Sequence, residues 1–119
     1  MKYFKPEEYT MGGEPCFEKM DKDHLEEQDE LREAFGHPMI PTSSYRSEAY
    51  NNELYRKLGK KPVKSQHLLG TATDYKNIYT SAQLHKLVSL ATERKMSIGI
   101  SKHFIHIDTR IGEEKLWVY

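Results

Sequence analysis

The hydrophobic pattern of this chain changes its period once, near Met96, and this change limits the folds that the chain can adopt. Before that residue, apolar side chains recur at three- and four-residue spacing, which is typical of amphipathic helices. After it the period is two, at residues 98–100, 104–108 and 116–119, which predicts strands. Helices interleaved with short strands, the last of them closely consecutive, predict an α+β fold with a small antiparallel sheet and about three helices.

Each expected helix begins at a side chain that is able to cap its first turn, and the first two end at a glycine. The helices are expected at residues 23–35, from Ser47 to Gly59, and from Thr80 to about Ala91. Further short strands are expected at residues 39–42 and 70–75. Residues 1–20 show no steady period and are expected to form an irregular lead-in that packs aromatic side chains on the core.

Length and charge exclude several classes of protein. A chain of 119 residues supports one core, so we expect a single domain over residues 1–119. Lys and Arg together number 18, and so do Asp and Glu, so the formal net charge is zero. A neutral chain has no overall attraction to the negative charge of nucleic acid or of a membrane surface. No apolar stretch approaches the ~20 residues of a membrane helix, and the first residues do not resemble a signal peptide. We therefore expect a monomer, made in the cytoplasm, that binds neither nucleic acid nor membrane.

The charges are nevertheless unevenly distributed. Eight of the 18 acids lie between Glu18 and Glu33, whereas residues 56–64 hold five basic side chains and no acid. Solvated helix faces and a polar loop are the ordinary explanation for such runs. A nucleic-acid interface at residues 56–64 is the weaker alternative, because no aromatic platform or helix-turn-helix pattern accompanies the basic residues.

Three side chains at expected strand edges are able to bind a metal: His67, Asp74 and His106. Two imidazoles and a carboxylate suit zinc, and three protein ligands leave the fourth position open, as in catalytic zinc sites. Gly70 allows the chain to turn so that His67 and Asp74 face one point. Of the other four histidines, those at positions 24, 37 and 85 are expected at the surface, and His103 is considered below.

A longer pattern surrounds these residues. Ser-x-His-x-x-Gly-x-Ala-x-Asp occupies residues 65–74, His-x-Asp follows at residues 106–108, and Ser-Ser-Tyr-Arg-Ser precedes them at residues 43–47, with Asn51 after it. This order of elements resembles that of the zinc D-Ala-D-Ala metallopeptidases, which include D,D-carboxypeptidases, phage L-alanyl-D-glutamate endolysins and murein endopeptidases. The resemblance runs from about Phe4 to Tyr119 and implies the hedgehog-like zinc fold of that family.

The resemblance also implies roles for single residues. The family's ligands for one Zn²⁺ ion fall on His67, Asp74 and His106, and its substrate-binding arginine falls on Arg46. The two serines that the resemblance places at the substrate are Ser44 and Ser65. Zinc lowers the pKa of its bound water to about 7, and an arginine in this place suits a peptide carboxylate or the oxyanion of a tetrahedral intermediate.

The general base is the point at which this chain departs from its relatives. Many of them have Glu or Asp three residues before the last zinc histidine, where this chain has His103. His103 is the first choice for the base, because its ordinary pKa is near neutral. Asp108 is the competitor; on a strand it shares a face with His106 and is also placed to orient that imidazole.

Two functions follow from the resemblance. The first is a zinc peptidase that hydrolyses peptide bonds in peptidoglycan stem peptides or cross-links, as a carboxypeptidase or an endopeptidase. It would act on the cell wall after release by a holin, as a phage lysin does, or as part of a phage particle. The second is a non-catalytic zinc-binding module on the same scaffold, as in hedgehog signalling domains, and the missing acid before His106 motivates it.

Overall fold

Three α-helices form where the sequence provides caps. The computed structural model describes residues 1–119, and its helices are α1 (Lys22–Phe35), α2 (Glu48–Lys57) and α3 (Ser81–Glu93). The expected caps Ser47 and Thr80 each accept a hydrogen bond from the backbone of the first turn. Helix α1 begins slightly earlier than expected, because the carboxylate of Asp21 accepts a hydrogen bond from the backbone N–H of His24.

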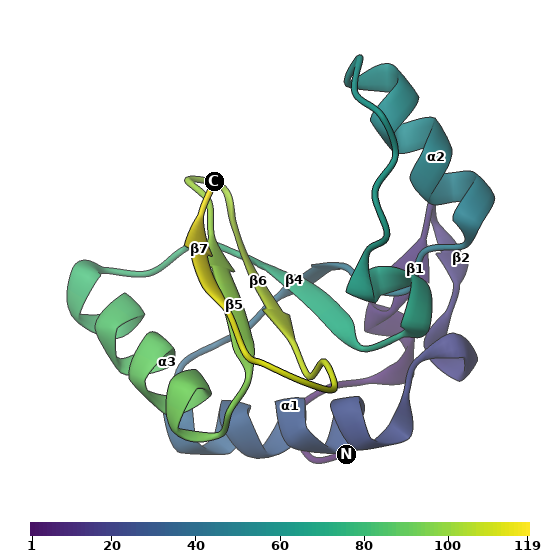
Figure 1. Ribbon diagram of the computed structural model, residues 1–119. Coiled ribbons are helices and arrows are strands. Elements are labelled where there is room, and N and C mark those ends of the chain that lie inside the picture. The colour runs from purple at the N-terminus through teal and green to yellow at the C-terminus, as the bar shows by residue number, and fades with distance from the viewer.

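Five strands make the main sheet, in the order β3-β4-β6-β5-β7 (Figure 1). They are β3 (Pro41–Ser43), β4 (Ala72–Lys76), β5 (Ser97–Ile100), β6 (Phe104–Asp108) and β7 (Leu116–Val118). The α+β prediction is confirmed, with one correction: β7 pairs with β5 in parallel, whereas all other pairs are antiparallel. The pairing follows from the chain path, because β6 ends beside the start of β5 and the chain then returns along the free edge of β5.

Shorter elements complete the chain. A two-stranded hairpin and three turns of 3₁₀ helix were not expected individually: η1 (Pro6–Glu8), β1 (Thr10–Met11), β2 (Glu14–Pro15), η2 (Phe17–Lys19) and η3 (Gln66–Leu69). The lead-in places Phe4 and Tyr9 in the core, as expected. No helix is both long and apolar enough to cross a membrane.

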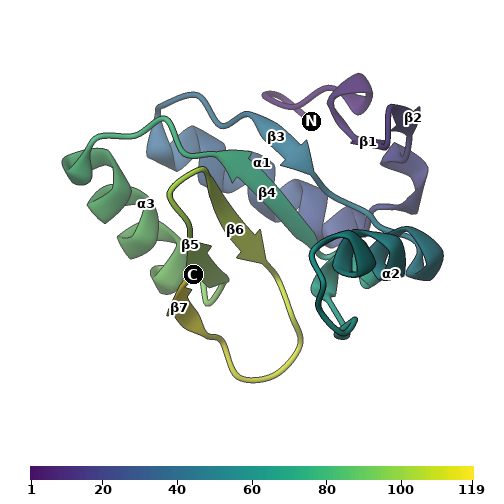
Figure 2. The ribbon, with the colours of Figure 1, turned by 90° about the horizontal axis from the view of Figure 1, so that it is seen from above.

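The main sheet has two chemically different faces. Alternation along β4 and β6 turns Tyr75 and Ile107 toward the core, which α1 and α3 close. The same alternation turns Asp74 and His106 to the opposite face. Helix α2 lies on the other side of the molecule from α3 and buries only Asn51, so it borders this second face without covering it (Figures 1 and 2).

His24 corrects one sequence prediction, because it is completely buried instead of exposed. Its Nδ1 lies 3.0 Å from the hydroxyl of Thr109, and its Nε2 lies 2.9 Å from the hydroxyl of Thr73. The ring therefore joins α1 to β4 and to the segment after β6. Burial lowers the pKa of His24 from 6.5 to about 3, because the charged imidazolium is costly to bury.

We expect this histidine to make the folded state less stable in acid. Below pH 6.5 the unfolded chain protonates His24 and the folded chain does not, so the free energy of unfolding falls by up to about 1.4 kcal/mol per pH unit down to about pH 3. Urea unfolding of the wild type and of His24→Gln at several pH values measures this slope. In the variant, the free energy of unfolding should fall less between pH 6 and about pH 4, the range in which His24 titrates in the unfolded chain and most carboxylates do not yet titrate. His85→Gln, at an exposed position, is the control; a slope unchanged in His24→Gln would contradict the assignment.

Candidate metal centre

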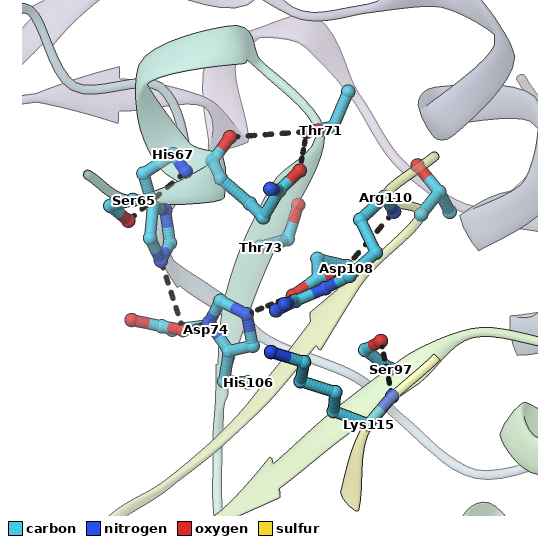
Figure 3. Close-up of polar contacts among 12 residues, drawn as sticks. Ser65, His67, Thr71, Thr73, Asp74, Ser97, His106, Asp108, Arg110 and Lys115 are labelled. Atoms are coloured by element: carbon cyan, nitrogen blue, oxygen red, sulfur yellow. Dashed lines mark hydrogen bonds and ion pairs between the residues drawn. The ribbon is translucent and has the colours of Figure 1, made fainter. Parts of the chain in front are cut away.

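Three elements bring together the metal-binding side chains. His67 comes from η3, Asp74 from β4 and His106 from β6, and one ligand atom of each lies within 4.8 Å of the others (Figure 3). Asp74 and His106 are direct partners in the antiparallel register, so their side chains share a face. Ser65 caps η3 by accepting a hydrogen bond from the N–H of His67, and Gly70 ends η3 at φ +72°. The turn that the sequence predicted at Gly70 is confirmed.

The hydrogen bonds of the two histidines determine which nitrogen faces the centre. Nδ1 of His67 contacts the backbone carbonyl of Ser44, which only accepts, so Nδ1 carries the hydrogen. Nε2 of His106 lies 2.7 Å from Oδ2 of Asp108, and a carboxylate likewise accepts. The lone pairs of His67 Nε2 and His106 Nδ1 therefore point toward Asp74, whose Oδ1 lies 3.3 Å and 3.0 Å from them.

Three electron pairs that converge in a buried place require a positive charge among them. Protons take that role without a metal: burial lowers the pKa of His106, but hydrogen bonds with Asp108 and Asp74 outweigh it and raise the pKa above 6.5. Burial raises the pKa of Asp74, but hydrogen bonds from His106 and His67 bring it below its ordinary value. Two neutral imidazoles and one carboxylate at this spacing fit Zn²⁺, which binds three protein ligands in catalytic sites.

Asp108 lies behind the ligands, where it orients His106. It is fully buried and also accepts two hydrogen bonds from the guanidinium of Arg110, from Nε at 2.8 Å and from an Nη at 2.6 Å, and a third from the backbone N–H of Arg110 at 3.2 Å. Burial raises the pKa of Asp108, but the bonds from Arg110 and then from His106 lower it to about 2. Asp108 is thus an anion that fixes the tautomer of a metal ligand.

Arg110 and Trp117 are the members of the site that sequence reasoning missed. The ring centroids of Trp117 and His106 lie 5.2 Å apart, and Cζ of Arg110 lies 5.6 Å from the centroid of the Trp117 ring. Trp117 fits because Gly99 on β5 has no side chain; a Cβ there would overlap the indole. A usable signal for Arg110 was its place two residues after Asp108, which continues the alternation of His106 and Asp108. The strand pattern at residues 116–119 gives no sign that Trp117 lies at the site.

A cleft with a volume of about 580 Å³ lies over the ligands, and His67, Asp74 and His106 form part of its lining. Arg46 and Ser65, which the sequence predicted at the substrate, also line it. An Nη of Arg46 lies 3.5 Å from Oδ2 of Asp74, and its Nε donates to the Ser43 hydroxyl at 3.3 Å. The arginine is therefore held beside the metal ligands, with its charge at the cleft.

Two predicted site residues lie elsewhere. The side chain of Ser44 is buried and does not line the cleft; its carbonyl is what holds His67. His103 is exposed in the bend before β6, where its backbone N–H contacts the Ser101 hydroxyl at 3.4 Å, and it is also absent from the lining. The structure does not bring His103 to the ligands, so its role as general base stays a prediction without support from the geometry.

A buried His-Asp-His set beside an arginine and a cleft, on an α+β scaffold, could hold one metal ion and is the kind of site that mononuclear metallohydrolases use. Comparison with protein-family models agrees: the model described as Peptidase M15 matches residues 2–108. The chain belongs to this family, the zinc D-Ala-D-Ala metallopeptidases, as the motif at residues 65–74 predicted. No match is found among curated proteins.

Proposed function

We propose that the protein hydrolyses peptide bonds in the stem peptides or cross-links of bacterial peptidoglycan. The observation that carries the proposal is the set of three converging ligand atoms at a cleft that also holds Arg46. Bound zinc would supply a water of pKa about 7 and polarise the scissile carbonyl. We further propose that the protein is a monomer that reaches the cell wall after holin-type release or within a phage particle.

The residues of the chain have separate tasks in this proposal. Arg46 binds either the carboxylate of the peptide or the oxyanion that forms at the scissile carbonyl, since its cationic fork lies beside the ligands. Ser65 lies in the same lining and is placed to hydrogen-bond the substrate. Asp108 keeps Nε2 of His106 protonated, so that Nδ1 is available as a ligand.

The alternative is a non-catalytic zinc-binding module, and one observation favours it. Apart from the ligand Asp74, no acid lines the cleft, and His103 lies outside it. A general base must reach the attacking water directly or through one water molecule. The proposed hydrolysis thus requires that a ligand carboxylate oxygen or a rearranged His103 accept the proton.

Incubation of the zinc-loaded protein with purified sacculi and with soluble muropeptides, followed by mass spectrometry, tests the proposal. Loss of a terminal residue would identify a carboxypeptidase, and internal fragments would identify an endopeptidase. His67→Ala should show no cleavage, because it removes a ligand. Equal cleavage by wild type and His67→Ala would refute metal-dependent hydrolysis, whereas zinc binding without any cleavage would favour the alternative.

A further inference from the structure

The cleft has an excess of positive charge that the chain as a whole does not have. Cationic and acidic side chains number 18 each in the sequence, whereas the cleft lining holds five cations and a single acid, Asp74. Two of the cations, Arg46 and Arg110, approach carboxylates of the chain itself. The other three form no ion pair in the structure, and we call them the lysine wall: Lys57, Lys60 and Lys64.

The lysine wall lies along one side of the cleft. Lys57 ends α2, and the other two lysines belong to the segment that leads from α2 to η3 (Figure 1). The side-chain amide of Asn51 donates to the carbonyl of Val63 at 3.2 Å, which ties this segment to the helix. The nearest acid along α2, Glu53, is paired with Arg56, and neither of them lines the cleft. The lysine wall therefore has no ion-pair partner within the protein, and the one acid that interacts with it, Glu53 on Lys57, already forms an ion pair with Arg56.

The lining also includes aromatic side chains from the sheet. Phe104, Trp117 and Tyr119 come from β6 and the C-terminal residues, and their rings pack on one another. The ligands lie in the same lining. A peptide bound in the cleft would therefore contact aromatic rings from the sheet on one side and the ammonium groups of the lysine wall on the other.

We propose that this cleft selects peptides that carry carboxylate side chains near the scissile bond, and that the lysine wall is the part that binds those carboxylates. The inference rests on the proposed peptidase function, because it names the substrate class of the same site. Flexible ammonium groups act as point charges and do not require one geometry, so they suit carboxylates at several positions of a peptide. Electrostatic attraction of this kind also accelerates association at low salt.

Binding of two probe peptides to the zinc-loaded protein tests this inference apart from turnover. One probe is an acetylated and amidated hexapeptide of alternating Ala and Glu; the other has Gln in place of each Glu. The readout is the fluorescence of Trp117, the only tryptophan, within seconds of mixing. The wild type should bind the Glu peptide roughly tenfold more tightly, as two or three exposed charge pairs permit. Salt near 0.5 M should remove most of this preference, since it shortens the Debye length to roughly 4 Å.

The variant K57Q/K60Q/K64Q should lose the preference and keep its affinity for the Gln peptide. The matched control is K5Q/K61Q/K86Q, which removes the same net charge from exposed lysines outside the cleft lining and should keep the preference. Equal affinities of the wild type for the two peptides, or an equal loss in the control, would overturn the inference. Tighter wall-dependent binding of a ten-nucleotide oligothymidine than of the Glu peptide would also overturn it, in favour of nucleic acid. Intact preference without cleavage of sacculi would refute the proposed function alone.

Discussion

Replacement of Asp74 by asparagine should weaken zinc binding by more than about a hundredfold, because changes beyond the ligands themselves already cost 10- to 100-fold. Asp74 provides the only negative charge among the three ligands. Its Oδ1 lies 3.3 Å from Nε2 of His67 and 3.0 Å from Nδ1 of His106. The substitution keeps the size of the side chain but removes the charge that stabilises a divalent cation in a buried place. Zinc-dependent hydrolysis should be lost with the metal.

Competition with a chromophoric chelator measures the zinc affinity. Asp108→Asn should give an intermediate result, a loss of about 10- to 100-fold, since Asp108 acts on the metal only through His106. Asp23→Asn, at an exposed position of α1, is the control and should bind zinc as the wild type does. The loss of zinc affinity is therefore expected to be largest in Asp74→Asn, intermediate in Asp108→Asn and absent in Asp23→Asn. Wild-type affinity in Asp74→Asn would show that the metal binds elsewhere.

The parts of the fold that the sequence predicted are those set by local chemistry. The caps at Ser47 and Thr80 act within one helical turn, so residue type alone marks where these helices begin. The family motifs at residues 65–74 and 106–108 named Asp74 and His106 as ligands of one ion, and the register of β4 with β6 explains why the two side chains meet. Strand alternation then directs both side chains to the face that α1 and α3 leave open.

The parts that the sequence did not predict depend on contacts between distant segments. His24 was assigned to the surface because its helix position alone does not reveal that Thr73 and Thr109 satisfy both of its nitrogens. The parallel pairing of β7 depends on which edge of the sheet remains free after β6 has paired. Trp117 reaches the metal site only because its strand lies beside Gly99, and no pattern within residues 116–119 contains that information.

Gly70 provides a second large effect, on stability, through the contact that anchors the metal-binding turn. It has a φ of +72°, and a Cβ at this position would lie 2.5 Å from the carbonyl oxygen of Lys19 and 2.9 Å from the backbone nitrogen of Asp21. Both atoms are main chain, and the N–H of Asp21 donates to the carbonyl of Gly70 at 3.0 Å. Relief of the overlap requires that the end of η3 separate from the segment before α1.

Gly70→Ala should therefore lower the free energy of unfolding by about 4 kcal/mol, which combines left-handed strain of about 1–2 kcal/mol with the backbone overlap. Gly36→Ala is the matched control: this glycine also ends a helix, at φ +75°, but nothing lies within 4 Å of its added Cβ. The control should lose only the strain, about 1–2 kcal/mol. Urea unfolding of both variants with chelator present isolates the fold from metal binding. Equal losses would mean that backbone conformation alone makes glycine necessary at position 70, whereas the larger loss in Gly70→Ala identifies the contact between η3 and the start of α1 as the anchor that holds His67 over the sheet.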